Sequence, residues 1–262
     1  MTASASTSPP VILITGAATG IGAACALAFA QQGWQVVIGA LDDATCSEAD
    51  QLALDCAAVG PAPLVQPLDV RDDAACQRCA RVALERFGRI DALINCAGTT
   101  RFIPHANLAA LSAEEFHRTY DVNVVGMYQM TRACAEALAV SGAGAVVNIS
   151  SIGGLLGRGS SVAYAASKGA VNTLTLALAR ALAPGVRVNA IAPGMVVGGL
   201  PSRVLDAAKH DEVVALQTAS SVLRRVSQPV EVAALAWFLC TSAPGITGEI
   251  IKMDNGLHLN AG

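Results

Sequence analysis

Short apolar segments alternate with longer segments of helical periodicity along nearly the whole chain. The apolar segments are rich in Val, Ile and Ala and almost unbroken, which is typical of strands that helices cover on both faces. We expect strands at residues 11–15, 35–40, 63–68, 91–95, 144–149, 186–191 and 249–254, with helices between them. This alternation predicts an α/β fold, a doubly wound sheet of about seven parallel strands with helices on both faces.

The distribution of Gly and Pro indicates one domain. These residues mark the junctions between the expected strands and helices, and no stretch after residue 10 has the composition of a linker. The chain has 262 residues, which is enough for one large α/β domain. We expect a disordered arm at residues 1–10 and a single domain over residues 11–262. Within it, residues 195–227 are the least regular and form a candidate lid over a substrate pocket.

Three glycines follow the first expected strand. Residues 16–22 read Gly-Ala-Ala-Thr-Gly-Ile-Gly and lead into an apolar helix. A strand, a glycine turn and a helix in this order point free backbone N–H groups and the positive end of the helix at a pyrophosphate. The alternative is an ordinary turn that is rich in glycine, and the turn alone does not separate the two interpretations.

The spacing of these glycines, G-x-x-x-G-x-G, resembles the short-chain dehydrogenase/reductase family, and the resemblance continues along nearly the whole chain. Further motifs follow in the family's order, with Ser151 thirteen residues before Tyr164. Cys96 is a departure, because the family has a second Asn there. The matching segments are Asp69-Val70, Asn95-Cys96-Ala97-Gly98, Asn123, Asn148-Ile149-Ser150-Ser151, Tyr164-Ala165-Ala166-Ser167-Lys168, Pro193-Gly194, Thr247-Gly248 and Asp254-Asn255-Gly256.

The resemblance implies a Rossmann-type domain that binds a nicotinamide dinucleotide. It implies Tyr164 as the catalytic acid/base, supported by Lys168 and Ser151, and Asn123 as the residue that holds a water between Lys168 and solvent. Tyr164 and Lys168 would also contact the cofactor. The other expected cofactor-binding residues are Gly16, Thr19, Gly20, Ile21, Gly22, Leu41, Asp42, Asp69, Val70, Asn95, Ala97, Gly98, Pro193, Gly194 and Val196.

The chemistry of Tyr164 and Lys168 can be argued from their spacing. Residues four apart share one face of a helix, so the ammonium group can lie near the phenol. A free tyrosine, with a pKa of about 10, is a poor base at neutral pH. Lowering that pKa by about three units needs roughly 4 kcal/mol, which one cation near 4 Å supplies at an effective dielectric constant of about 20. Ser151, at the carboxyl end of a strand, would hydrogen-bond the substrate oxygen.

The choice of cofactor depends on charges near the second expected strand. NADP needs a cation for its 2′-phosphate, yet no Lys or Arg precedes Arg71. Asp42 would instead accept a hydrogen bond from a ribose hydroxyl, although the family's usual acidic residue aligns with Ala40. We therefore expect NAD in preference to NADP. Gly198 replaces a Thr of many relatives, so the nicotinamide carboxamide would depend more on the backbone of Val196.

Charge and composition restrict the partners. The net charge of −3 provides no basic field for nucleic acid or an anionic membrane, and no apolar run approaches the roughly 20 residues of a membrane span. We expect neither partner, and a cytoplasmic location, because the first ten residues do not resemble a signal peptide. Hydrophobic residues make up 53% and charged residues 14%. This apolar composition, together with a C-terminal strand like the family's interface strand, predicts a homotetramer.

Eight cysteines are scattered along segments of mostly helical pattern. Cys76 and Cys79 form a C-x-x-C pair, but no second Cys or His pair stands at the spacing of zinc ligands. We expect reduced, mostly buried thiols and no metal site.

These observations lead to one main hypothesis and two alternatives. The main hypothesis is an oxidoreductase that transfers a hydride between NAD(H) and a small-molecule secondary alcohol or its ketone. An NADPH-dependent 3-oxoacyl-[acyl-carrier-protein] reductase is the enzymatic alternative, which the missing cations oppose. A catalytically silent nucleotide-binding sensor or scaffold is the alternative from another class. The presence of all four expected catalytic residues argues against it.

Overall fold

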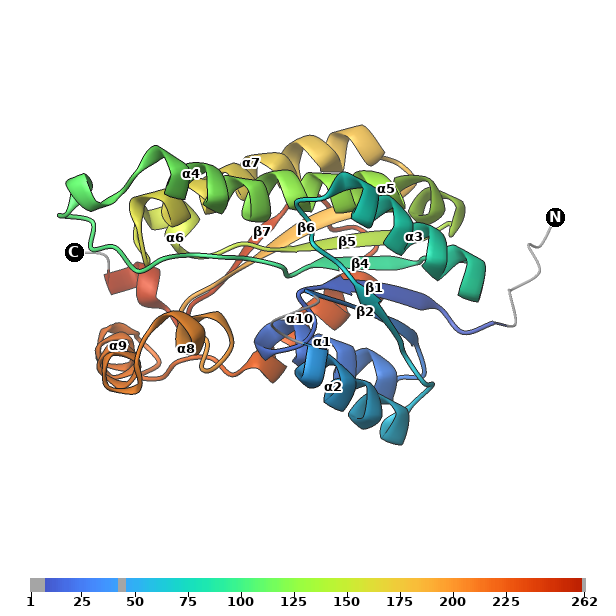
Figure 1. The fold of residues 1–262 in the computed structure, drawn as a ribbon, viewed down its shortest axis with the longest axis horizontal. Helices are drawn as coiled ribbons and strands as arrows, with labels where there is room; N and C mark the ends of the chain where they lie inside the picture. The colour runs from blue at the N-terminus through green and yellow to red at the C-terminus, as the bar shows by residue number, and fades with distance from the viewer. Residues whose placement is uncertain (1–7, 42–45, 261–262) are drawn as a thin grey trace.

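The computed structural model describes residues 8–41 and 46–260. Within them, seven parallel strands form one sheet in the order β3-β2-β1-β4-β5-β6-β7 (Figure 1). The fold is therefore the doubly wound, Rossmann-like sheet that the sequence predicts. The strands are β1 (Val11–Thr15), β2 (Gln35–Ala40), β3 (Leu64–Pro67), β4 (Ala92–Asn95), β5 (Gly144–Ile149), β6 (Val186–Pro193) and β7 (Ile250–Met253).

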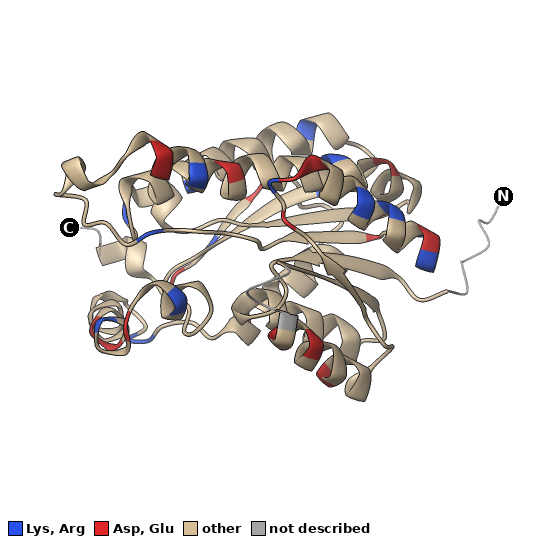
Figure 2. Ribbon diagram, viewed as in Figure 1, with Lys and Arg blue, Asp and Glu red and all other residues tan. Residues whose placement is uncertain are grey.

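Helices cover both faces of the sheet, as Figure 1 shows. One face carries α3 (Asp73–Phe87), α4 (Ala113–Tyr120), α5 (Met127–Val140) and α7 (Val162–Leu182). The other face carries α1 (Gly20–Gln31), α2 (Cys46–Val59) and α10 (Pro229–Thr241). Charged residues lie mainly on the helices and loops, and the sheet between the two layers is nearly free of them (Figure 2).

The remaining elements lie around the carboxyl ends of the strands. The short α6 (Gly153–Leu156) follows β5, and α8 (Leu200–Val204) and α9 (Ala207–Ser220) follow β6. Figure 1 shows α8 and α9 beyond the end of the sheet, within the stretch expected to form a lid. The 3₁₀ turns η1 (Leu108–Ala110) and η3 (Leu257–Asn260) and the π-helical turn η2 (Asp121–Gly126) complete the described chain.

Two hydrophobic cores hold the layers to the sheet. Strand residues alternate between the faces, so Ile12 and Ile14 of β1 pack toward α1 and α10 while Leu13 packs toward α3 and α5. In the first core Phe29 contacts Trp34 and Trp237 edge to face, with ring centroids 5.1 and 4.9 Å apart. The contact between Phe29 and Trp237 ties α1 to α10.

The topology places many of the expected site residues at the carboxyl ends of the strands. β1 pairs with β2 on one side and with β4 on the other. The connection after β1 therefore runs toward β2, whereas the connection after β4 runs toward β5 on the opposite side. The loops after β1 and β4 therefore diverge, and a crevice opens between them at the carboxyl ends of the strands.

Candidate active site

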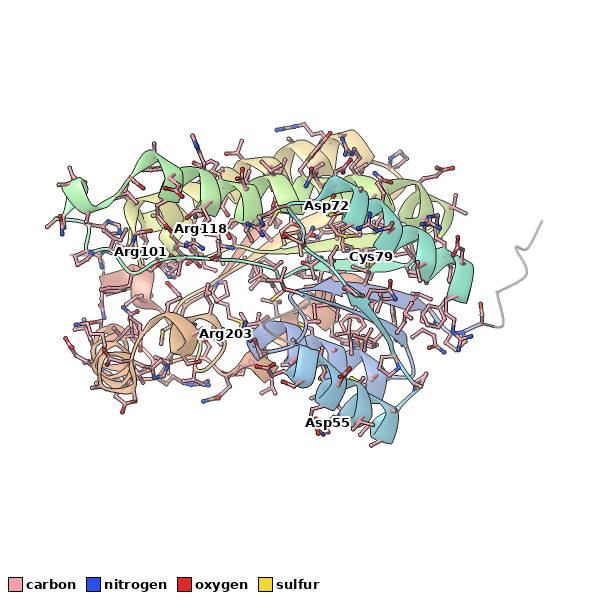
Figure 3. All side chains as sticks on the ribbon, viewed as in Figure 1. Asp55, Asp72, Cys79, Arg101, Arg118 and Arg203 are labelled. Atoms are coloured by element: carbon pink, nitrogen blue, oxygen red, sulfur yellow. The ribbon has the colours of Figure 1, made fainter. Side chains whose placement is uncertain are left out.

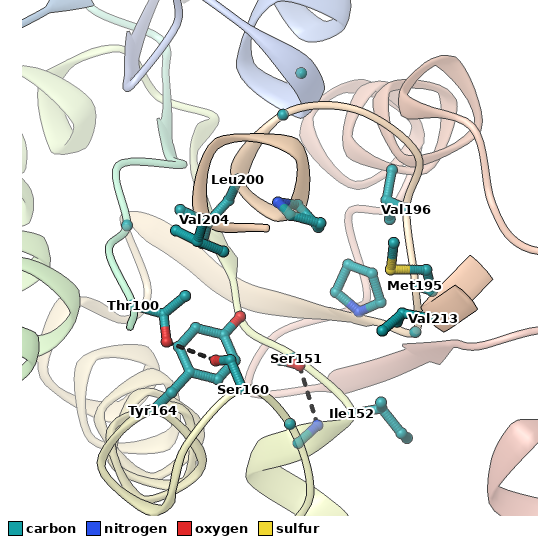
Figure 4. A pocket seen from close by; sticks show the side chains of 18 of the residues that line it. Thr100, Ser151, Ile152, Ser160, Tyr164, Met195, Val196, Leu200, Val204 and Val213 are labelled. Atoms are coloured by element: carbon teal, nitrogen blue, oxygen red, sulfur yellow. Dashed lines mark hydrogen bonds between the residues drawn. The ribbon is translucent and has the colours of Figure 1, made fainter. Parts of the chain in front are cut away.

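A cavity of about 550 Å³ lies at the carboxyl ends of the strands. Its walls come from the glycine turn, the ends of β4, β5 and β6, the start of α7, and the α8 and α9 segment (Figure 4). One continuous space therefore joins the expected nucleotide-binding turn to Ser151, Tyr164 and Lys168.

The glycine turn presents backbone to this cavity. Gly16 and Gly20 have positive φ angles of 62° and 57°. A Cβ at Gly16 would lie 2.7 Å from Ala97 Cα, and one at Gly22 would lie 2.4 Å from the Gly16 carbonyl oxygen. The N-cap residue of α1, Thr19, makes no side-chain capping bond. Thr19 thus leaves N–H groups at the start of α1 uncapped, and this cradle fits the pyrophosphate of a dinucleotide.

Ser151 and Tyr164 lie near each other on the cavity wall, although they belong to different elements (Figure 4). Ser151 follows β5, and its Oγ accepts a hydrogen bond of 3.0 Å from the Gly153 N–H. Tyr164 lies in the first turn of α7, where Ser161 Oγ caps the helix by accepting the Tyr164 N–H at 3.1 Å. The cap determines where α7 begins and therefore where the phenol enters the cavity.

Lys168 lies one turn beyond Tyr164 and is buried. Its Nζ donates a hydrogen bond of 2.7 Å to the Ile149 carbonyl at the end of β5 and lies 5.7 Å from the centroid of the Tyr164 ring. Burial lowers the pKa of Lys168 to about 8, because the ammonium group has lost water. It therefore remains mainly cationic at neutral pH.

The pKa of Tyr164 differs from the sequence argument. Burial raises this pKa above its ordinary value of 10.0, while the hydrogen bond with Ser151 lowers it to a smaller extent. Burial has the larger effect on this pKa, so the lowering that the sequence argument expects from Lys168 is not seen here. The phenolate would lose more hydration than expected, and the Lys168 ammonium is directed at the Ile149 carbonyl.

Asn123 lies in the π-helical turn between α4 and α5 and is fully buried. Its Oδ1 accepts the Thr99 N–H at 2.8 Å, and its Nδ2 donates to the Thr99 carbonyl and to Ser167 Oγ, each at 3.0 Å. A Cβ at Gly98 would lie 3.5 Å from Asn123 Oδ1 and 3.9 Å from Lys168 Nζ, so both side chains converge there. Asn123 thus joins the loop after β4 to α7.

Other expected residues divide into two groups. Gly16, Thr19, Gly20, Ile21, Ala97, Gly98, Pro193, Gly194 and Val196 line the cavity together with Ser151, Tyr164 and Lys168. Gly22, Leu41, Asp69, Val70, Asn95 and Asn123 do not appear in its lining. Asp42 lies outside the described residues.

The second group has identifiable roles elsewhere. Asp69 forms an ion pair with Arg71 at 2.6 Å, which lowers the pKa of its carboxyl. Asn95 points into the sheet core, where its Nδ2 donates to Thr131 Oγ1 and Asn148 Oδ1, each at 2.9 Å. Val70 packs against Gly126, where a Cβ would lie 2.5 Å from a Val70 methyl group. Asp69, Val70 and Asn95 thus make these contacts within the protein, and their contact with a cofactor stays a prediction.

Two features of the cavity were not identified from the sequence. Thr100 and Ser160 join their hydroxyl groups at 2.5 Å beside Tyr164 (Figure 4). Arg158 lines the same part of the cavity. No local motif identifies these residues, because their proximity depends on how the loops after β4 and β5 meet.

The α8 segment lies against the nucleotide half of the cavity. A Cβ at Gly20 would lie 2.8 Å from Gly199 Cα, so the segment just before α8 touches the glycine turn through backbone atoms. Arg203 of α8 lies 3.7 Å from Glu48 of α2. Figure 3 shows Arg203 at the same end of the molecule as Arg101, which follows β4. Arg203 therefore places a cation beside the nucleotide half of the cavity, although it lies far beyond Arg71 in the sequence.

Among the described residues, no cluster of three or more His, Cys, Asp or Glu side chains could hold a metal ion. No helix in residues 8–41 and 46–260 is long and apolar enough to cross a membrane.

Comparisons with known proteins place the chain in a family. A family model described as enoyl-(acyl carrier protein) reductase matches residues 16–258. The chain is 38% identical to a Streptomyces violaceoruber protein named as ketoacyl reductase 2 of the granaticin polyketide synthase, over 95% of this chain and 96% of that protein. It is 35% identical to the L-fucose dehydrogenase of Mus musculus, over 96% of this chain and 89% of that enzyme.

A solved structure agrees with these matches. A Burkholderia xenovorans protein named as a short-chain dehydrogenase/reductase is 51% identical, with a TM-score of 0.90, over 97% of this chain and 99% of that chain. The chain therefore belongs to the short-chain dehydrogenase/reductase family. It is an oxidoreductase that interconverts hydroxyl and carbonyl groups with a nicotinamide cofactor.

Proposed function

We propose that Tyr164 is the acid/base of this oxidoreductase and that its substrate is a secondary alcohol or the corresponding ketone. The observation that carries the proposal is the meeting of Ser151 and Tyr164 above the buried Lys168, in a cavity continuous with the glycine turn. A phenol, a hydroxyl and a cation at the end of a nucleotide-binding cleft are suited to moving one proton beside a hydride acceptor.

Each residue has a distinct role in alcohol oxidation. Ser151 orients the substrate hydroxyl, whose proton passes to the Tyr164 phenolate as the carbonyl forms. Lys168 stabilises the phenolate electrostatically, and in ketone reduction Tyr164 returns the proton. A bound oxidised nicotinamide supplies the hydride acceptor and a positive charge that adds to that of Lys168. Asn123 is a positioning residue, since its side-chain bonds hold Thr99 and Ser167 beside Lys168 and Tyr164.

The cofactor is proposed to be NAD rather than NADP. The support is the lack of any Lys or Arg before Arg71 and the acidic Asp42 after β2. Arg203 is the cation that could oppose this choice, but it already faces Glu48. NADH is expected to bind at least about tenfold more tightly than NADPH, a difference of about 1.4 kcal/mol.

Fluorescence titration of the protein with each reduced nucleotide measures this preference directly. The variant Arg203→Gln is the matched control: the preference should persist without Arg203 if it arises from the turn after β2. Equal affinity for the two nucleotides, or tighter binding of NADPH, would show that the proposal is wrong.

The reductase alternative has support from the comparisons. The matching family model is described as an enoyl-(acyl carrier protein) reductase, and one relative is named as a ketoacyl reductase. A panel of secondary alcohols, ketones and 3-oxoacyl thioesters, followed at the nicotinamide absorbance with each cofactor, separates the two functions. Alcohol oxidation with NAD supports the main proposal, whereas reduction confined to 3-oxoacyl thioesters with NADPH supports the alternative.

A homotetramer is the proposed assembly. Several large apolar side chains on the α5 and α7 layer are exposed, including Val125, Tyr128, Val140 and Leu176. Such a surface is typical of contacts between subunits. The mass in solution at micromolar concentration tests this proposal, and a monomer would contradict it.

A further inference from the structure

The cavity contains more positive charge than the proposed reaction uses. Its lining includes four cations, Arg158, Lys168, Arg203 and Lys209, and one carboxylate, Glu212, although the whole chain has a net charge of −3. An excess of cations around a cavity favours an anionic ligand. A dinucleotide pyrophosphate accounts for charge beside the glycine turn, but that explanation does not extend to every cation.

Three of the four cations already have acceptors. Lys168 donates to the Ile149 carbonyl at 2.7 Å. Lys209 pairs with Glu212 at 2.8 Å, and Arg203 faces Glu48 on the nucleotide side at 3.7 Å. Arg158 has no ion pair within residues 8–41 and 46–260. It is thus a lining cation with its charge available to a ligand.

The backbone that carries Arg158 is held beside the reacting groups. Its neighbours Gly157 and Gly159 have positive φ angles of 64° and 130°, which side chains rarely adopt. A Cβ at Gly159 would lie 3.3 Å from Cδ1 of the Tyr164 ring, so the loop lies directly on that ring. Arg158 is therefore one residue from a glycine that touches the proposed catalytic phenol.

Two contacts fasten this loop to the opposite wall. The Ile103 N–H donates to the Ser160 carbonyl at 2.7 Å, and the Thr100 and Ser160 hydroxyl groups lie 2.5 Å apart (Figure 4). These contacts hold the backbone of the loop beside Tyr164, and the exposed Arg158 side chain extends from that loop. A cation carried so close to the reacting groups can select one substrate group.

Much of the remaining cavity lining is apolar. It includes Phe102, Leu156, Met195, Val213, Leu216 and Leu257. These residues offer contacts to a hydrocarbon body and leave few polar partners for it.

We propose that the substrate is an amphipathic anion: a secondary alcohol or ketone on a hydrocarbon body that ends in an oxyanion, which Arg158 binds. A guanidinium group pairs with either a carboxylate or a phosphate through two parallel hydrogen bonds. The inference rests on the proposed function for the position of the reacting carbon. It makes Arg158 the residue that determines specificity for the charged end.

Binding of simple amphiphiles to the protein saturated with NADH tests this inference without a known substrate. The probes are decanoate, decyl phosphate and the neutral decanol, with affinity measured by calorimetry. The wild-type protein should bind at least one anion about tenfold or more tightly than Arg158→Gln does, while decanol should bind both proteins equally. The preferred anion distinguishes a carboxylate substrate from a phosphate substrate.

Arg180→Gln is the matched control, because Arg180 is an exposed arginine near the far end of α7. It should leave anion binding unchanged, and Arg158→Lys should retain part of it. Equal anion binding by wild type and Arg158→Gln, or wild-type binding of anions no tighter than decanol, would overturn the inference. Failure of the proposed function would give a different result, namely no hydride transfer with any alcohol or ketone in the panel.

Discussion

Replacing Tyr164 by Phe is expected to lower turnover by about 10²–10⁴ while fold and nucleotide binding remain intact. The substitution removes one hydroxyl group, and with it the proposed acid/base, which typically contributes a factor of this size. The ring that packs against Gly159 is retained, and the α7 cap depends on Ser161 and backbone, so the helix should start at the same place. Steady-state assays with the best substrate of the panel, together with NADH titration and thermal unfolding, provide the measurements.

Tyr128→Phe is the matched control for this experiment. Tyr128 is an exposed residue of α5 outside the cavity lining, so the same chemical change should leave turnover unaltered. A folded Tyr164→Phe protein that keeps near-normal turnover would remove Tyr164 from the mechanism.

A second large effect is expected at alkaline pH, because six described cysteines are buried. Burial raises the pKa of Cys56 and Cys76 to about 11 and that of Cys79 to about 12, from an ordinary value of 9.0. It raises the pKa of the other buried thiols as well, those of Cys25, Cys134 and Cys240. Figure 3 shows Cys79 on α3, where it is packed into one of the two cores.

The sign of the effect follows from proton binding. Above pH 9 the unfolded chain releases thiol protons that the folded protein retains, so stability is present below pH 9 and is lost as the pH rises toward 11 or 12. A thiol that is fully protonated in the folded protein and ionised in the unfolded chain lowers the free energy of unfolding by about 1.4 kcal/mol per pH unit. The lowered pKa of Lys168 acts in the opposite direction between about pH 8 and 10.5, but it is a single group.

The protein should therefore lose stability as the pH rises from 9 to 10.5, and its Tm should fall over the same range. Calorimetry under reducing conditions at several pH values measures it. Cys134→Ala is the control. Whatever it does to stability at neutral pH, it should reduce the slope of stability against pH by the contribution of one thiol. A Tm that is constant up to pH 10.5 would contradict this account.

The sequence predicted the fold well because buried parallel strands have a simple pattern. β1, β2 and β5 begin and end where the apolar runs do. β6 extends beyond the expected 186–191 to Pro193, because Ala192 and Pro193 still pair with β7. The exact start of α3 at Asp73 depends on the Asp72 carboxylate, which caps the helix by accepting the Ala74 N–H. Motif spacing does not reveal such details.

The candidate site was predictable where backbone conformation or helical spacing determines position. The glycine turn and the spacing of Tyr164 and Lys168 are of this kind. For Asn95 the motif gives a position at a strand end but not the face toward which the side chain points, and the structure directs its Nδ2 at Thr131 and Asn148. The sequence could not predict that Arg158 lacks an ion pair among the described residues, because this depends on where carboxylates distant in the sequence lie in the fold.

The most direct test of the central claim, that Tyr164 and Lys168 together carry the proton, is the pH dependence of hydride transfer. Single-turnover oxidation of the best alcohol of the panel by NAD, followed at the nicotinamide absorbance, measures it for wild type and Lys168→Ala. The wild-type rate should increase with pH as the Tyr164 phenolate forms. In Lys168→Ala the rate should be lower, and its increase should move to higher pH by about one unit or more, because the phenolate loses the neighbouring cation. A Lys168→Ala protein that folds and binds NAD but keeps the wild-type pH profile would contradict the claim.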